Sequence, residues 1–156
     1  MKKLLSLSII LLISLGISAT ASAQWSGGGG LAYGTEVSEL GLQLNGVYDI
    51  DEEWRGSADF IYYFVSGEMS ISELNFNAHY IFHEEDELTA YAIGGLNYLR
   101  VSASYGGFSA SSSEIGLNLG AGLEYELDFA NLFAEAKFTI SSFDQLVIAS
   151  GLRFPF

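Results

Sequence analysis

Residues Glu39 to Ile50 read E-L-G-L-Q-L-N-G-V-Y-D-I. Apolar or aromatic side chains stand at every second position, Leu40, Leu42, Leu44, Tyr48 and Ile50, except at Gly46, and most of the intervening residues are polar. Strict alternation over this length predicts a β-strand that has one apolar and one polar face. The rest of the chain repeats this period of two, so the stretch decides the fold class.

The same alternation is regular in four further segments: Trp54–Val65, Glu73–His83, Glu114–Leu127 and Leu132–Ser141. It is weaker in three others, Trp25–Gly34, Leu88–Val101 and Leu146–Phe156. Gly94 and Gly95 interrupt the pattern in the second of these, where we expect a β-bulge. The chain therefore predicts eight strands, and no segment shows the 3.6-residue period of an amphipathic helix.

The connections between these segments alternate in character. Acidic tight turns (Asp49–Glu53, His83–Glu87 and Asp128–Asn131) alternate with the loops Gly34–Ser38, Ser66–Ser70, Ser102–Ser113 and Ser142–Gln145. An antiparallel up-and-down meander produces this order, because its tight turns gather at one end and its loops at the other.

The first 23 residues have the three parts of a cleavable secretory signal. Lys2 and Lys3 precede an apolar run of about fourteen residues, which is shorter than the roughly twenty of a spanning helix. Ala21-Ser22-Ala23 then forms a small-residue cleavage site. We expect residues 1–23 to be a signal peptide and residues 24–156 to be one domain.

Charge excludes one class of partner. Without residues 1–23, four cations (Arg55, Arg100, Lys137 and Arg153) face 19 carboxylates. Nucleic acid binding depends on clustered Lys and Arg, so this balance argues against it. The chain also has no cysteine and thus no disulfide framework.

Alternation is compatible with either a membrane barrel or a soluble sandwich or lipocalin-like barrel. Segments of about ten to fourteen residues suit tilted membrane strands, which need about nine to eleven. Aromatic residues flank the aliphatic band, as the two interfaces of a bilayer select. Those near the acidic turns are Trp25, Tyr48, Trp54, Tyr80, Phe82, Tyr125, Phe154 and Phe156, and those near the loops are Tyr33, Phe64 and Phe138. These features favour an eight-stranded antiparallel transmembrane β-barrel.

The Gly-rich stretch QWSGGGGLAYG at Gln24–Gly34 and the ending GLRFPF at Gly151–Phe156, together with the signal and eight strands, resemble the small outer-membrane β-barrel superfamily of OmpX and the OmpA membrane domain. This resemblance implies a bacterial outer-membrane location, a periplasmic N-terminus and extracellular loops. It also implies insertion by the barrel-assembly machinery, which recognises a last strand with a terminal aromatic residue. Leu152, Phe154 and Phe156 form that stripe in this chain.

An eight-stranded barrel encloses a lumen just wide enough for side chains to fill. Turning the chain at Asp128–Asn131 and at Ser142–Gln145 brings Glu124, Glu135, Lys137 and Arg153 close together on the lumen side. We expect these four residues to form a cluster of buried, paired charges that plugs the lower lumen. The alternative is a set of separately solvated residues in a wet lumen.

No metal-binding, cofactor or catalytic motif is recognised, and no cofactor is expected. The two histidines, His79 and His83, lie in no known motif. His79 is expected to hydrogen-bond in the lumen rather than to act in catalysis. His83–Glu87 reads more readily as a solvated charge run than as a cation site.

Three functions remain open. The first is a monomeric, non-enzymatic structural barrel that contacts lipid or lipopolysaccharide, with binding through the Ser102–Ser113 loop. Tyr105 and Phe108 would make that contact, and the alternative is a mobile linker without a ligand. The second function is a narrow channel or transporter for small or apolar solutes. The third is a lipid-modifying barrel enzyme.

Overall fold

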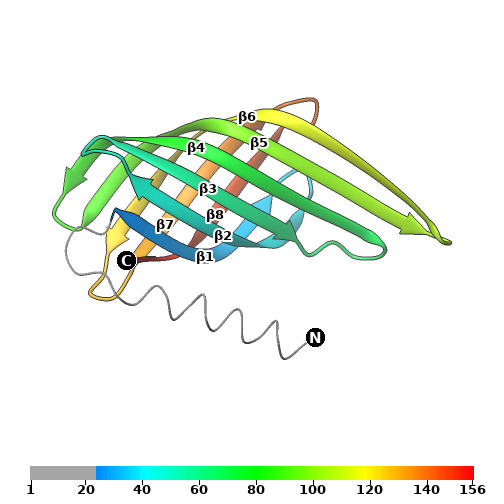
Figure 1. Cartoon of the computed structure of the whole chain (residues 1–156), viewed down its shortest axis with the longest axis horizontal. Helices are drawn as coiled ribbons and strands as arrows, with labels where there is room; N and C mark the ends of the chain where they lie inside the picture. Colours follow the sequence, from blue (N-terminus) through cyan, green and yellow to red (C-terminus); the bar gives the residue numbers. More distant parts are fainter. Residues whose placement is uncertain (1–23) are drawn as a thin grey trace.

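The protein is a closed antiparallel β-barrel, seen in a computed structural model that describes residues 24–156 (Figure 1). The expected signal peptide lies outside the described residues. Each strand pairs with its neighbours in chain order, and β1 pairs with β8 to close the barrel. The strands are β1 (Trp25–Gly34), β2 (Glu39–Asp49), β3 (Trp54–Tyr63), β4 (Met69–Glu85), β5 (Leu88–Tyr105), β6 (Phe108–Glu126), β7 (Asn131–Ile140) and β8 (Gln145–Pro155). The predicted eight-stranded meander is confirmed.

Burial alternates along most of the barrel wall, with the polar face of the strands turned inward. In β2, Leu42 and Leu44 are 47% and 57% exposed, whereas Gln43 between them is fully buried. The same inversion appears in β4, where Phe76 is 56% exposed and Asn75 is buried. A soluble barrel would bury the apolar face, so this surface is one that faces lipid. No helix within residues 24–156 is long and apolar enough to cross a membrane.

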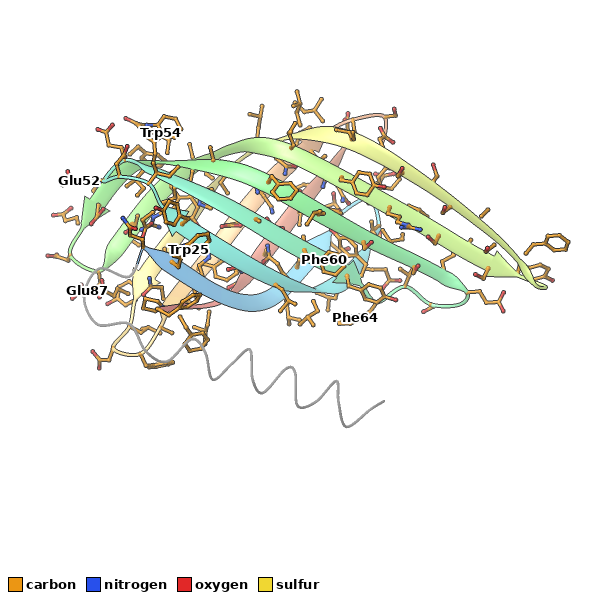
Figure 2. All side chains as sticks on the ribbon, in the orientation of Figure 1. Trp25, Glu52, Trp54, Phe60, Phe64 and Glu87 are labelled. Atoms are coloured by element: carbon orange, nitrogen blue, oxygen red, sulfur yellow. The ribbon has the colours of Figure 1, made fainter. Side chains whose placement is uncertain are left out.

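Aromatic pairs mark one edge of the lipid-facing belt. Trp25 lies beside its cross-strand partner Tyr48 with ring centroids 4.7 Å apart, and Trp54 lies beside Tyr80 at 5.0 Å. Figure 2 shows Trp25 and Trp54 at the same end of the barrel as Glu52 and Glu87 of the acidic turns. This end carries the predicted aromatic girdle, and by the expected orientation it is the periplasmic end.

The β4–β5 pair corrects two expectations. The pairing is regular through Gly94 and Gly95, and the irregularity lies in β4 between Ile81 and His83. The acidic turn is also shorter than predicted, because β4 continues through His83 to Glu85. Asp86, in the turn itself, takes a positive φ of 52°, a conformation that Asp tolerates better than most residues.

The Ser102–Ser113 segment was expected to be a loop, and this is wrong. Here β5 and β6 continue as a paired hairpin up to Tyr105 and Phe108, which lie opposite each other across Gly106 and Gly107. Both glycines have positive φ, 57° and 85°, as a two-residue hairpin turn requires. The hairpin extends past the other strand ends in Figure 1. A Ser/Gly composition suggests a linker, but Gly-Gly flanked by matched Ser and Ala residues also encodes a hairpin.

Glycines allow β1 and β8 to approach closely where the barrel closes. A Cβ atom placed on Gly28 would lie 1.8 Å from the backbone oxygen of Leu152, and one on Gly30 would lie 2.0 Å from that of Ser150. Any side chain at these positions therefore forces the two backbones apart. By contrast, a Cβ on Gly94 of β5 would meet nothing within 4 Å.

We expect Gly28→Ala to destabilise the barrel by at least about 3 kcal/mol, because the new methyl group collides with backbone that cannot move aside. Gly94→Ala makes the same chemical change in open space and is the matched control. Heat-modifiable gel mobility in detergent measures the folded fraction. Equal folded fractions for the two variants would contradict a requirement for glycine at the β1–β8 contact.

Candidate functional site

The barrel lumen is the candidate functional site, because buried polar and charged side chains from β2 to β8 converge there. The fully buried side chains include Arg153, Lys137, His79 and Glu73. In an eight-stranded barrel the inward residues of facing strands come within direct contact. Two hydrogen-bonded clusters result, one near the acidic turns and one nearer the outer end.

Arg153 of β8 is the centre of the first cluster. Its guanidinium donates to Glu124 at 2.8 Å and to Glu135 at 2.5 Å, forming two ion pairs. The same group donates to the Tyr91 hydroxyl at 3.0 Å and to the Asn45 side-chain oxygen at 3.1 Å. The guanidinium of a fully buried arginine is thus surrounded by acceptors, which offsets the cost of removing its charge from water.

Neighbouring side chains hold this cluster in place. The Arg153 guanidinium lies 4.1 Å from the centroid of the Phe133 ring, a cation–π distance. Tyr91 also donates to Glu135 at 2.8 Å. Arg55 joins Glu124 at 3.4 Å and Asp49 at 2.7 Å, which extends the cluster to the rim of the barrel.

The structure brings together three of the four residues expected in one cluster. Glu124, Glu135 and Arg153 meet, but the ammonium of Lys137 forms its ion pair with Asp59 of β3 at 2.7 Å. Glu124 and Glu135 are not direct cross-strand neighbours, since Glu135 lies opposite Gly122 and Glu124 lies opposite Phe133. Long side chains of Arg153, Glu124 and Glu135 span this offset inside the narrow lumen.

Lys137 and Asp59 belong to the second cluster, which is built mainly from asparagines. Asp59 accepts from Asn75 at 2.9 Å and from Asn77 at 3.3 Å. Asn118 donates to the side-chain oxygens of both asparagines, at 2.8 and 2.9 Å, and accepts from Thr139 at 2.8 Å. These bonds cross the lumen between β3, β4, β6 and β7.

The second cluster continues to a buried carboxylate toward the outer end. Asn97 donates to Asn75 at 2.8 Å and to Glu73 at 3.0 Å. Glu73 also accepts from the Tyr63 hydroxyl at 2.9 Å and from the Gln145 side chain. Sequence reasoning missed this asparagine cluster, although inward-facing Asn at alternate strand positions was the available signal.

His79 lies in the lumen wall without the partners of a catalytic histidine. Its Nε2 atom is 2.9 Å from the Ser57 hydroxyl, and its ring stacks on Tyr91 with centroids 4.5 Å apart. The Nδ1 atom of His79 has no hydrogen-bond partner in the described part of the chain. A general base is normally oriented by a second group on that nitrogen. His79 therefore packs between the two clusters as a polar wall residue.

The rim near the acidic turns is an open depression of about 770 Å³. Its lining combines Asp49–Glu53 with Arg55 and with Ile81–Glu84. His83 lies 3.6 Å from Glu85, and both side chains are largely exposed. Residues 24–156 contain no group of three or more potential metal ligands placed to hold an ion.

Tyr105 and Phe108 lie at the tip of the β5–β6 hairpin, 86% and 85% exposed. Val101, lower on the same hairpin, packs against the apolar cluster inside the outer end of the lumen, together with Val37, Val65 and Phe143. The base of the hairpin is thus fixed to the barrel, and its tip projects two aromatic rings into the surroundings.

The C-terminal stripe faces outward. Phe154 and Phe156 are 46% and 43% exposed, and the Phe156 amide donates to the Trp25 carbonyl at 2.9 Å. Leu152 lies on the same face of β8, two residues before Phe154. The last residues therefore complete both the β1–β8 pairing and the aromatic girdle.

Arg153→Met should lower the unfolding free energy in detergent by about 3–5 kcal/mol, because it leaves Glu124 and Glu135 buried without a cation. Arg100→Met removes an exposed arginine that makes no ion pair in the described structure and is the matched control. Adding Glu124→Gln and Glu135→Gln to Arg153→Met should recover part of the loss. Equal melting temperatures for the two single variants would contradict the cluster.

No family model matches the chain, and no curated protein matches it. Solved structures of other proteins share its fold, including the following three. The N-terminal β-barrel domain of Pseudomonas aeruginosa OprF aligns with a TM-score of 0.71 and 14% identity, covering 85% of this chain and 96% of that one. Neisserial surface protein A (NspA) gives 0.63 and 18% over 88% of this chain and 100% of that one. Ail, the attachment invasion locus protein of Yersinia pestis, gives 0.59 and 18% over 83% and 96%.

These similarities, at such low identity, concern the fold. The structure of this chain supports the same fold independently, through its closed eight-stranded barrel, its inward polar face and its aromatic girdle. The chain therefore has the fold of the small outer-membrane β-barrels of the OmpA and OmpX class, and its exposed apolar belt is a surface suited to lipid.

Proposed function

We propose that the protein is a small, monomeric, non-enzymatic barrel that contributes to the integrity of the bacterial outer membrane. The observation that carries this proposal is the side-chain network that fills the lumen. Hydrogen bonds link Glu73 through the asparagines to Asp59 and Lys137. Arg153 and its partners fill the lumen beyond them.

A filled lumen argues against the channel alternative. A solute would have to displace Arg153 from two carboxylates and separate Lys137 from Asp59, and each step leaves buried charge without a partner. Such a barrier opposes steady diffusion of ions or small solutes. An enzyme is disfavoured because His79 lacks an orienting partner and sits inside this filled space.

The hairpin tip supplies the surface for contacts outside the barrel. Tyr105 and Phe108 present aromatic area on a hairpin that is anchored at its base, so little ordering cost is paid on binding. Lipopolysaccharide, which covers the outer face of this membrane, is the proposed partner. We further propose that the barrel-assembly machinery inserts the chain by recognising the Leu152, Phe154 and Phe156 stripe.

Planar-bilayer recording should detect no steady conductance from the folded protein, because the lumen network excludes a continuous water path. Heat-modifiable mobility and proteoliposome flotation confirm that the protein is folded and inserted. Absence of conductance from such protein then indicates a closed lumen. Large, stable openings from inserted wild-type protein would contradict the structural role and favour the channel.

In a strain that lacks the gene, wild-type protein should restore resistance to detergents and bulky antibiotics. Tyr105→Ser combined with Phe108→Ser should insert normally, since both rings are almost fully exposed, yet restore resistance only partly. His79→Gln should restore it fully and leave the envelope lipids unchanged. Full restoration by the double variant would contradict a role for the hairpin, and altered lipids with His79→Gln would favour the enzyme.

A further inference from the structure

We infer that Arg100 is the centre of a binding site for an anionic, phosphate-bearing lipid headgroup at the outer edge of the apolar belt. The inference rests on the proposed outer-membrane role and identifies one specific lipid contact. The site lies on the lipid side of β4, β5 and β6, away from both lumen clusters and from the hairpin tip.

Arg100 differs from the other cations in its direction. Arg55, Lys137 and Arg153 all point into the lumen and form ion pairs there. Arg100 follows the outward face of β5, in phase with the exposed Leu96 and Tyr98, whereas Leu99 beside it is buried. Within residues 24–156, no carboxylate lies within 4.0 Å of the Arg100 guanidinium.

Arg100 lies where the outward face of β5 and β6 changes from apolar to polar residues. Tyr98 and its partner Ile115 are 41% and 71% exposed and form the last apolar row of the belt on these strands. The next outward row is Arg100 with Ser113 on one side and Ser72 on the other. Two residues along a strand span about 6.5 Å, so Arg100 begins within the headgroup layer rather than beyond it.

Serines occupy the neighbouring strand positions on the face of Arg100. Ser72 and Ser113 lie directly opposite Arg100, and Ser102 follows it on the same face of β5. Ser70 and Ser111 lie opposite Ser102 in turn. The guanidinium fork matches two phosphate oxygens, and neighbouring hydroxyls donate to the remaining ones.

The nearest carboxylate on the hairpin does not oppose this binding. Glu114 follows the inward phase of β6, opposite the buried Leu99. Its carboxylate accepts from the Ser142 amide of the β7–β8 turn. This hydrogen bond holds the carboxylate toward the β7–β8 turn and away from Arg100.

The test uses the folded chain in zwitterionic detergent, with hexa-acylated lipid A carrying two phosphates as the probe and native mass spectrometry as the readout. Wild-type protein should retain lipid A. Arg100→Gln should bind it about tenfold more weakly, as expected for loss of one charge-assisted contact. Arg100→Lys keeps the positive charge but lacks the planar guanidinium with its two parallel donors. Its affinity for lipid A should lie between those of wild type and Arg100→Gln. Ser104→Gln changes another exposed outward position on β5 and should match wild type.

Two further arms identify the headgroup as the source of the phosphate. Lipid A stripped of its phosphates should bind wild type and Arg100→Gln equally weakly. Millimolar inorganic phosphate should not displace lipid A, because acyl chains on the belt add to the affinity. Complete displacement by inorganic phosphate would overturn the lipid assignment, as would equal lipid A retention by wild type and Arg100→Gln. If the wild-type protein itself failed to insert and to show heat-modifiable gel mobility, the proposed function would be contradicted instead. Substitutions at position 100 are not expected to change this mobility.

Discussion

The structure depends on the requirement that every backbone N–H and C=O group within a hydrocarbon layer has a hydrogen-bond partner. A sheet meets this requirement only when its first and last strands pair and leave no open edge. Here β1 pairs with β8 along its length, and the pairing reaches from Gly34 to the Phe156 amide. Gly28 and Gly30 permit the close backbone approach that this closure needs. The glycine run and the aromatic ending therefore serve one physical purpose.

Closure turns the polar faces of the strands toward one another, and that arrangement governs what the protein can do. Carboxylates, amides and cations that would be solvated on an open sheet must satisfy each other in a narrow lumen. Arg153 does so with Glu124 and Glu135, and Lys137 does so with Asp59. A lumen whose charges are paired in this way supports the proposal of a structural barrel over a channel or an enzyme. Contacts with other molecules are therefore expected on the outside of the barrel.

The outside of the barrel changes character along its length. Around most of its height it is apolar, with paired aromatic rings at the acidic-turn end. On β5 and β6 it passes from Tyr98 and Ile115 to Arg100 and serines, and the hairpin then ends in two exposed aromatic rings. The hairpin is the part of the protein that extends farthest from the belt. Its two faces offer different chemistry, with serine hydroxyls and a cation on one and mainly apolar side chains on the other.

The sequence by itself determined the strand number, the antiparallel order, and which side chains face inward. These properties follow from the period-two pattern, because each residue of a strand must take one of two faces. The girdle was likewise readable from aromatic residues at the strand ends. The same pattern also placed Glu124, Glu135 and Arg153 on the inner face, but it did not identify which side chains they contact.

Only the tertiary structure decided register, pairing and strand length. Register decides which lumen side chains meet, and a shift of two residues keeps every face the same, so alternation could not separate Glu124 opposite Phe133 from Glu124 opposite Glu135. The Lys137–Asp59 pair joins strands far apart in the chain, which no local pattern records. The hairpin at Ser102–Ser113 was missed because the local sequence signal there is weak. Small residues have weak strand preference of their own, and pairing carried up from the barrel extends the two strands.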